Sequence, residues 1–181
     1  MLFSPKEIQM KDGRTAVLAS PDIRDAAEIL SQLEQTCAET PYLLREAGER
    51  NITLEQEEAF LQRKLDSESE CFIVCKVDGK VAGNSSLSFH TPRKTCHRAS
   101  VAIALGKAYW GQGIGTAMFE EMIRIAREHG KRQLELTFVE GNDRGLALYR
   151  KMGFEIAAAI PDAFRLGEND FRKEYHMIKY L

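Results

Sequence analysis

Residues 109–119, YWGQGIGTAMF, constrain the fold more than any other stretch of the chain. The glycines Gly111, Gly113 and Gly115 fall between an apolar run that predicts a strand and an amphipathic run that predicts a helix. Backbone N–H groups at a helix N-terminus have no partner within the helix, and the helix dipole is positive there. The turn is therefore suited to bind a diphosphate without a metal ion or a lysine.

The spacing of these glycines excludes two common phosphate-binding motifs. A dinucleotide fingerprint, GxGxxG, starting at Gly111 would need glycine at position 116, which is Thr116. A P-loop needs a Gly-Lys pair followed by Ser or Thr, which the chain lacks. What remains is the pattern QxxGxA, from Gln112 through Gly115 to Ala117. Since a glycine turn alone is often only a tight connection, the rest of the chain has to support a binding role.

The order of the predicted elements indicates an α/β fold. Asp12-Gly13 predicts a hairpin turn, Ser20 before Pro21 a helix start, and Thr53 a capping box with the glutamine three residues later. The expected elements are a hairpin over 7–19, helices over about 20–37 and 53–65, antiparallel strands over 71–77, 80–89 and 97–105, a helix over 113–129, a strand over 133–139, a helix over 143–152, and strands over 154–160 and 172–181 around a polar loop through Asp162, Gly167 and Asn169. The strand–helix–strand–helix run indicates a crossover.

Composition excludes several classes of protein. With 25 Lys and Arg against 27 Asp and Glu, the net charge of −2 gives no reason to expect a nucleic-acid partner. No apolar run approaches the ~20 residues that span a bilayer, and no signal peptide is recognisable, so we expect a cytoplasmic protein without a membrane partner. The cysteines lack a CxxC spacing, so we expect reduced thiols and no metal site; they are Cys37, Cys71, Cys75 and Cys96.

A second motif lies downstream of the glycine turn. The QxxGxA turn resembles motif A of the GCN5-related N-acetyltransferase (GNAT) superfamily, whose usual form is (Q/R)xxGx(G/A). Residues 142–154, NDRGLALYRKMGF, resemble motif B of that family, in which an asparagine precedes a helix that carries ALY and closes with GF. Two motifs at this distance are far more specific than either alone, and the chain is identified as a small, bacterial-type, single-domain member over residues 1–181. The resemblance implies a mixed, strongly bent sheet of about seven strands, with helices on both faces and a central V-shaped splay.

The resemblance implies acetyl-CoA as co-substrate and direct transfer of its acetyl group to a primary amine. The strand 101–105 would pair with the pantetheine arm, with the Leu105 N–H as donor to the oxyanion and Tyr149 as acid for the departing thiolate. A phenol with a pKa of ~10 stays protonated at neutral pH, and a thiolate of pKa ~8.5 can accept its proton or a hydrogen bond. The implied cofactor contacts are Ile103, Ala104, Leu105, Gln112, Gly113, Ile114, Gly115, Thr116, Ala117, Asn142, Leu148 and Tyr149.

The general base is less clearly indicated. An alkylammonium must lose a proton before it attacks, so a carboxylate or a histidine is expected near the acceptor. Many relatives carry a glutamate on the strand before motif A, where this chain has Ser100. The connector 39–42, which includes Glu39 and Tyr42, or Glu140 offers a substitute. The histidines at positions 90, 129 and 176 are isolated at element ends and are interpreted as surface or packing residues.

Several alternatives stay open. The enzyme could transfer another acyl group, such as succinyl, because the glycine turn binds the diphosphate and not the acyl chain. A second hypothesis is a module that senses acetyl-CoA without turnover, for which Tyr149→Phe would cost no function. Asn142 could be a simple helix cap, and Trp110 could pack in the core or shield the cofactor. The acceptor could be a small molecule or a peptide, and the resemblance is compatible with a homodimer.

Overall fold

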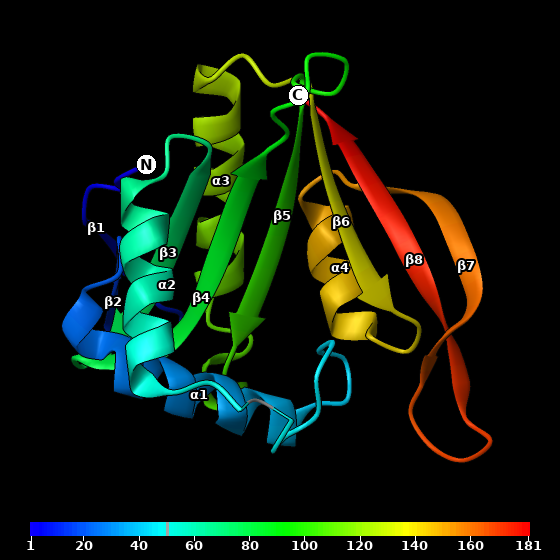
Figure 1. Ribbon diagram of the computed structural model, residues 1–181, viewed down its shortest axis with the longest axis horizontal. Coiled ribbons are helices and arrows are strands. Elements are labelled where there is room, and N and C mark those ends of the chain that lie inside the picture. The colour runs from blue at the N-terminus through cyan, green and yellow to red at the C-terminus, as the bar shows by residue number, and fades with distance from the viewer. Residues whose placement is uncertain (50) are drawn as a thin grey trace.

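The computed structural model describes residues 1–49 and 51–181, which form one mixed sheet flanked by helices (Figure 1). The sheet order is β1-β2-β3-β4-β5-β6-β8-β7. The strands are β1 Lys6–Gln9, β2 Thr15–Ala19, β3 Glu70–Val77, β4 Lys80–Phe89, β5 Arg98–Leu105, β6 Gln133–Val139, β7 Glu155–Arg165 and β8 Phe171–Tyr180. The helices are α1 Ala26–Glu39, α2 Leu54–Asp66, α3 Ile114–Glu128 and α4 Asp143–Lys151, with 3-10 turns at Ile23–Asp25 and Lys107–Tyr109. The α/β prediction is confirmed, with eight strands in place of about seven.

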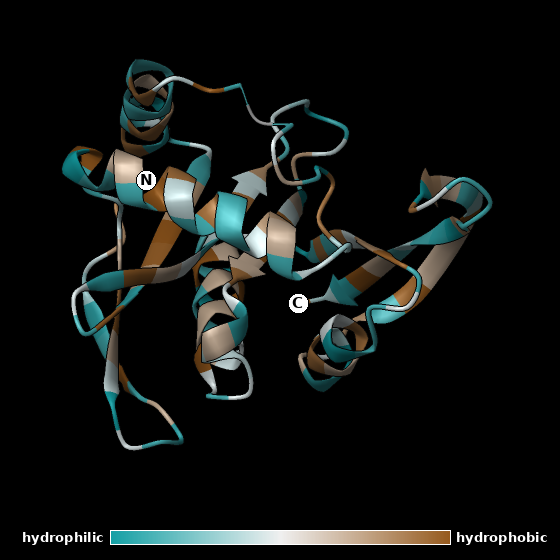
Figure 2. Ribbon diagram, turned by 90° about the horizontal axis from the view of Figure 1, so that it is seen from below, coloured by the Kyte–Doolittle hydropathy of each residue, from teal (hydrophilic) through white to brown (hydrophobic). Residues whose placement is uncertain are grey.

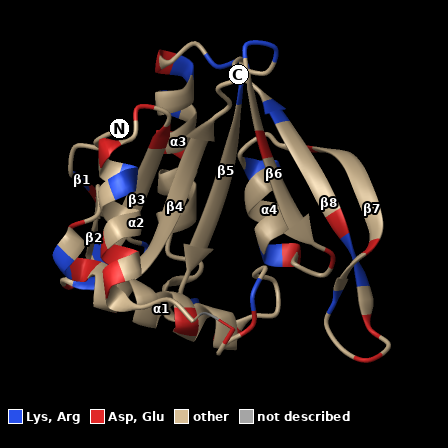
Figure 3. Cartoon of the chain, in the orientation of Figure 1, with Lys and Arg blue, Asp and Glu red and all other residues tan. Residues whose placement is uncertain are grey.

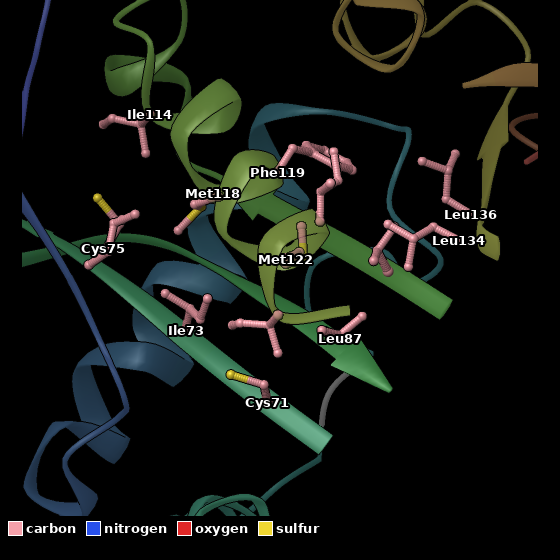
Figure 4. Close-up of a cluster of buried hydrophobic side chains, with 14 of the residues drawn as sticks. Cys71, Ile73, Cys75, Leu87, Ile114, Met118, Phe119, Met122, Leu134 and Leu136 are labelled. Carbon is pink, nitrogen blue, oxygen red and sulfur yellow. The ribbon is translucent and has the colours of Figure 1, made fainter. Parts of the chain in front are cut away.

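Helices cover both faces of the sheet, because the central strands are apolar on both sides. Alternate residues of a strand point to opposite faces, so Cys71 and Ile73 of β3 face α3 while Phe72 and Val74 face α1 and α2. Figure 2 shows α1 and α2 on one side of the strands and α3 and α4 on the other. The core beneath α3 is shown in Figure 4 and includes Cys75, Leu87, Met118, Phe119, Met122, Leu134 and Leu136.

The sheet divides between β5 and β6. These strands run parallel, joined by the α3 crossover, and pair only over Arg98–Ser100 and Gln133–Glu135. Beyond this point β5 stays paired with β4 as far as Leu105, whereas β6 stays paired with β8 as far as Val139. The two strands therefore diverge in the V that Figure 1 shows, with α1 and α4 at its open end. The predicted splay is confirmed.

Two predicted boundaries are wrong. The first helix begins at Ala26, after a 3-10 turn capped by Asp22, and not at Ser20. The Ser20 hydroxyl instead accepts a hydrogen bond from the N–H of Phe3 at 2.7 Å, so it is not available to cap a helix. Asp162, expected in a loop, lies within β7, where its positive φ of 52° coincides with a register shift. In contrast, the capping box at Thr53 is confirmed.

The cysteines of β3 are structural. Cys71 and Cys75 are buried, and burial raises the pKa of Cys71 and raises that of Cys75 to about 12. Within residues 1–49 and 51–181, no cluster of three or more His, Cys, Asp or Glu is arranged to hold a metal ion. No helix in the same ranges is long and apolar enough to cross a membrane.

Candidate active site

The unpaired edge of β5 forms one wall of the opening. Hydrogen bonds from Gly106 N–H to the Ala82 carbonyl, at 3.0 Å, and from His90 N–H to the Arg98 carbonyl, at 3.1 Å, fix which residues of β5 turn their backbone toward β4. Since these directions alternate along a strand, the N–H groups of Ile103 and Leu105 point the other way, into the opening. They have no partner among the described residues. An extended ligand can pair with this edge as an added strand would.

Trp110 holds the end of this strand. Its indole N–H donates to the Leu105 carbonyl at 2.6 Å. The Leu105 carbonyl is therefore occupied while the Leu105 N–H stays open. Trp110 therefore does more than pack in the core or shield a ligand, because its half-buried ring also fixes the last peptide of β5.

The glycine turn places four open N–H donors at the end of the same strand. Gly113 caps α3 in the left-handed region, with a φ of 94°, which favours glycine. The first intrahelical bond runs from Ala117 N–H to the Gly113 carbonyl, so the N–H groups of residues 113–116 have no partner in the described chain. Gly115 lies against α4, since a Cβ there would be 3.0 Å from Leu148 Cδ2. These unbonded donors make the turn suited to bind an anion.

The other predicted residues of this turn have different tasks. The Gln112 side chain accepts from the Asp12 N–H at 3.1 Å, and its carbonyl accepts from the Lys11 N–H at 3.2 Å, so Gln112 ties the turn to the β1–β2 hairpin. The Ile114 side chain is fully buried and can contribute only its backbone to a ligand. The Thr116 hydroxyl accepts from Lys151 Nζ at 3.2 Å.

Two basic side chains of α4 reach the glycine turn, and sequence reasoning missed both. The Arg144 guanidinium lies 5.3 Å from the centre of the Trp110 ring, and one of its nitrogens lies 3.7 Å from where a Cβ of Gly111 would be. Lys151 contacts Thr116, as described above. The seven-residue separation of Arg144 and Lys151 places them on one face of the helix, which is the signal that could have found them.

Motif B positions Asn142 and Tyr149. Asn142 caps α4 by accepting from the Gly145 N–H at 2.9 Å, so the capping interpretation is confirmed for this residue. Tyr149 packs between Phe119 and Phe138, each with ring centres 5.7 Å away, and burial raises its pKa to about 12. The described residues offer its hydroxyl no hydrogen bond, yet the oxygen is not fully buried. The hydroxyl is therefore protonated and free to donate to a ligand.

Near the apex of the V, the opposite face of the sheet, toward α1, is polar. Ser100 lies at the last paired position before the strands diverge, opposite Glu135. Its hydroxyl lies 3.1 Å from Glu135 Oε1 and 3.0 Å from His90 Nε2, and Arg98 Nε donates to Glu135 Oε2 at 3.0 Å. We call His90, Arg98, Ser100 and Glu135 the apex cluster. Along the opening, β4 and β5 are otherwise uncharged beyond their first residues, as Figure 3 shows.

The two carboxylates considered from sequence have structural partners. Glu39 accepts from the Lys107 N–H at 2.7 Å. Glu140 accepts from the Lys173 N–H at 3.3 Å and from the Tyr175 hydroxyl at 3.2 Å, and the backbone hydrogen bond from Lys173 lowers the Glu140 pKa. Glu140 is therefore a weaker base than a free carboxylate.

The connector between α1 and α2 reaches the open end of the V. Tyr42 lies against the turn after β6, where its hydroxyl is 3.5 Å from the position of a Gly141 Cβ. Figure 1 shows this connector extending from the end of α1 toward α4. Phe89, by contrast, packs in a tilted arrangement against His129 on the α3 side, at a ring-centre distance of 5.0 Å, so it does not line the α1 face.

Comparison with known proteins gives one consistent result. The model of the acetyltransferase (GNAT) family matches residues 29–154. A GNAT-family acetyltransferase from Streptococcus pneumoniae superposes with a TM-score of 0.85 at 28% identity, over 92% of this chain and 99% of that one. The structure of yncA from Salmonella typhimurium with acetyl-CoA superposes with a TM-score of 0.77 at 18% identity, over 92% and 94% of the two chains, which shows a common fold.

Curated relatives match only in part. An uncharacterized N-acetyltransferase of Methanocaldococcus jannaschii is 29% identical over 106 residues, which cover 56% of this chain and 46% of that protein. The L-amino acid N-acetyltransferase AaaT of Escherichia coli is 24% identical over 108 residues, covering 59% of this chain and 66% of that protein. The chain thus matches about half to two thirds of the length of these two proteins.

Proposed function

The chain belongs to the acetyltransferase (GNAT) family, and we propose that it transfers the acetyl group of acetyl-CoA to a primary amine of a small molecule or a peptide. One observation carries the proposal. The open edge of β5 runs directly into the unbonded N-terminus of α3, so one opening offers donors for an extended arm and, next to them, donors for a diphosphate. Acetyl-CoA combines these two chemical parts.

The residues present fit such a ligand. The N–H groups of residues 113–116 hold the diphosphate, supported by the positive end of α3 and by the charges of Arg144 and Lys151. The N–H groups of Ile103 and Leu105 pair with the arm, with Ala104 between them on the strand and Ala117 on the first turn of α3. Leu148 lies over Gly115 and closes the gap between α3 and α4.

Acetyl-CoA supplies an acyl carbon that forms a bond to the amine nitrogen, while the C–S bond breaks and its electron pair leaves on sulfur. The chain contributes fixed donors. The donor to the acyl oxygen, where negative charge develops, is then the Ile103 N–H rather than the Leu105 N–H, because an arm that starts at the glycine turn meets Leu105 first. The Trp110 indole holds the Leu105 carbonyl and so fixes the peptide that follows Leu105. Direct transfer needs no nucleophilic side chain, because the amine itself attacks.

Tyr149 stabilises the departing sulfur as a hydrogen-bond donor. With its pKa raised to about 12, the phenol is a weaker acid than a thiol of pKa ~8.5, so complete proton transfer to the thiolate is uphill by about three to four pKa units. A charge-assisted hydrogen bond does not require that transfer. The thiolate is then protonated from solvent, and Tyr149 keeps its proton.

The experiment measures release of free CoA thiol from acetyl-CoA against a panel of L-amino acids, polyamines, aminoglycosides and short peptides. Release with one acceptor class, reduced about tenfold or more in Tyr149→Phe, supports the proposal and identifies the acceptor class. Succinyl-CoA in place of acetyl-CoA tests the acyl group. Stabilisation by acetyl-CoA without release would favour the sensor hypothesis, and no stabilisation at all would contradict the proposed binding site.

A further inference from the structure

We propose that His90 accepts the proton that the acceptor amine must lose, with Glu135 and Ser100 holding its ring. This inference rests on the proposed function and assigns its missing base. Sequence reasoning placed an expected carboxylate at Ser100, found none, and gave His90 no role. The structure brings Ser100, His90 and Glu135 together from three separate stretches of the chain.

The position of the apex cluster connects it to the opening. Ser100 and Glu135 form the last pair before β5 and β6 separate, and the open N–H groups begin three residues later, at Ile103. Ala102, the next residue after Ser100 on the same face, is exposed. A ligand arm that follows the edge of β5 from α3 toward the apex therefore brings its far end toward the cluster, which an amine can approach from the α1 face.

The hydrogen bonds define the tautomer of His90. Its Nε2 lies 2.9 Å from Glu135 Oε1 and 3.0 Å from the Ser100 hydroxyl. A carboxylate can only accept, so the proton of the neutral ring is assigned to Nε2. Nδ1 has no hydrogen-bond partner within the described ranges, so its lone pair is available. The ring is then arranged as an oriented base backed by a carboxylate.

The charged side chains that the structure describes around His90 form ion pairs with one another. Arg98 of β5 binds Glu135 Oε2, so the cluster contains one cation and one anion before His90 is protonated. Further along the same face, Ser88 donates to Glu70, which is paired with Lys64 of α2. The side chains of His90 and Glu135 are 26% and 21% exposed, so the pair is shielded but still reachable.

The proton of the acceptor amine passes to His90 and then to solvent. An N–H bond of the ammonium breaks, its electron pair stays on nitrogen as the attacking lone pair, and the proton moves to His90 Nδ1, directly or across one water molecule. The imidazolium that forms donates from Nε2 to Glu135, whose negative charge stabilises it. His90 then releases the proton to solvent, and the cycle needs no oxidant or further reactant.

A second histidine on the same face provides a matched control. His176 of β8 pairs with Glu174 at 3.1 Å, and it lies on the other arm of the V, opposite Thr137 of β6. Its side chain is 43% exposed, and in the described structure it forms no hydrogen bond or ion pair with β5. His176 thus has the same chemistry without the link to the open edge.

The test compares His90→Gln with His176→Gln in the full chain, using the acceptor identified by CoA release. Gln can still donate to Glu135 but cannot take up a proton. We expect His90→Gln to lower kcat/KM about 100-fold and to remove the rise of kcat/KM with pH, while acetyl-CoA affinity stays within about twofold. His176→Gln should leave both within about twofold.

Two further measurements separate proton removal from folding or binding. An acceptor amine that is already neutral at the assay pH should be acetylated by His90→Gln within about threefold of wild type, because its proton need not be removed. Glu135→Gln should lower kcat/KM about tenfold while acetyl-CoA affinity stays within about twofold, since the imidazolium formed in the step loses the negative charge beside it.

Some outcomes would overturn the inference. An unchanged pH profile in His90→Gln would do so, and so would loss of the profile in His176→Gln alone, which would assign the base to the other arm. If His90→Gln failed to fold, an unchanged kcat/KM in a folded Glu135→Gln would count equally against it. A wild type that released no CoA with any amine would instead contradict the proposed function, which distinguishes the two failures.

Discussion

At the opening, the two faces of the sheet present different kinds of polar group to a ligand. On the α3 side, two continuous stretches, 103–117 and 142–149, supply mostly backbone N–H groups. On the α1 side, the polar groups are side chains from separate places, including His90, Ser100 and Glu135. A backbone N–H can donate whichever side chain its residue carries, provided that the glycines of the turn are kept. The polar groups of the α1 face are side chains, so each substitution there changes the groups that a ligand would meet. The first face therefore suits a ligand common to a family, and the second suits a particular acceptor.

The largest expected effect breaks the α3 face alone. In Gly115→Val, the Cβ would lie 3.0 Å from Leu148 Cδ2, and its methyl groups would push α4 away and cover neighbouring N–H donors. We expect acetyl-CoA affinity to fall at least about 100-fold in isothermal titration calorimetry.

The control for this change is Gly130→Ala at the other end of α3, where φ is 67° and no atom lies within 4 Å of the new Cβ. It should destabilise the chain by about 1 kcal/mol, because L side chains rarely adopt this conformation, without altering affinity. Equal affinity loss in both variants would mean that Gly115 acts through stability and not through the anion site.

The next largest effect tests whether the Tyr149 hydroxyl, which lies on the α3 side of the sheet, also takes part in the reaction. Tyr149→Phe removes only the hydroxyl, which has no protein partner in the described chain. We expect kcat to fall about 10- to 100-fold while acetyl-CoA affinity stays within about twofold. In Tyr175→Phe, which loses a hydrogen bond to Glu140, kcat should change by about twofold or less. A similar loss in both variants would contradict a role for Tyr149 at the sulfur.

A smaller effect sharpens the electrostatic side of the comparison. Arg144→Ala removes a charge beside the glycine turn and its contact with the Trp110 ring. We expect acetyl-CoA affinity to fall about three- to tenfold at low salt and less at high salt, since exposed charges are screened. Arg144→Lys should recover part of this affinity. Affinity loss that did not depend on salt would indicate that Arg144 acts by packing on Trp110.

Continuity along the chain explains what the sequence could predict. The QxxGxA turn and the NDRGLALY stretch are each local, so they predict a helix N-terminus and leave a cap at Asn142 open, and the structure has both features. The α/β order and the splay follow from periodicity and the resemblance in the same way. Ser20 failed as a cap because a distant group, the Phe3 N–H, uses its hydroxyl.

The apex cluster could not be predicted for the same physical reason. Its members are joined by strand register, and a slip of one residue would turn Ser100 to the α3 face. Register is set by many long-range pairs, such as Ser100 with Glu135, that no local pattern reports. Arg144 and Lys151 are partly predictable from sequence. Helical spacing predicts that they share a face of α4, but it does not predict that they contact the glycine turn.

The smallest expected effect tests whether Glu140 only stabilises the fold or also supplies the base. Because its pKa is lowered in the folded state, its carboxylate contributes stability above the usual Glu pKa of ~4.3, and this contribution is lost as pH falls through the folded value. Glu140→Gln should therefore lower Tm by about one or two degrees at neutral pH, with the difference from wild type vanishing in acid. Thermal melts across pH measure this, with kcat/KM profiles alongside. If Glu140→Gln instead abolished the rise of kcat/KM with pH, the turn after β6 would supply the base, and the acceptor chemistry would not depend on the apex cluster.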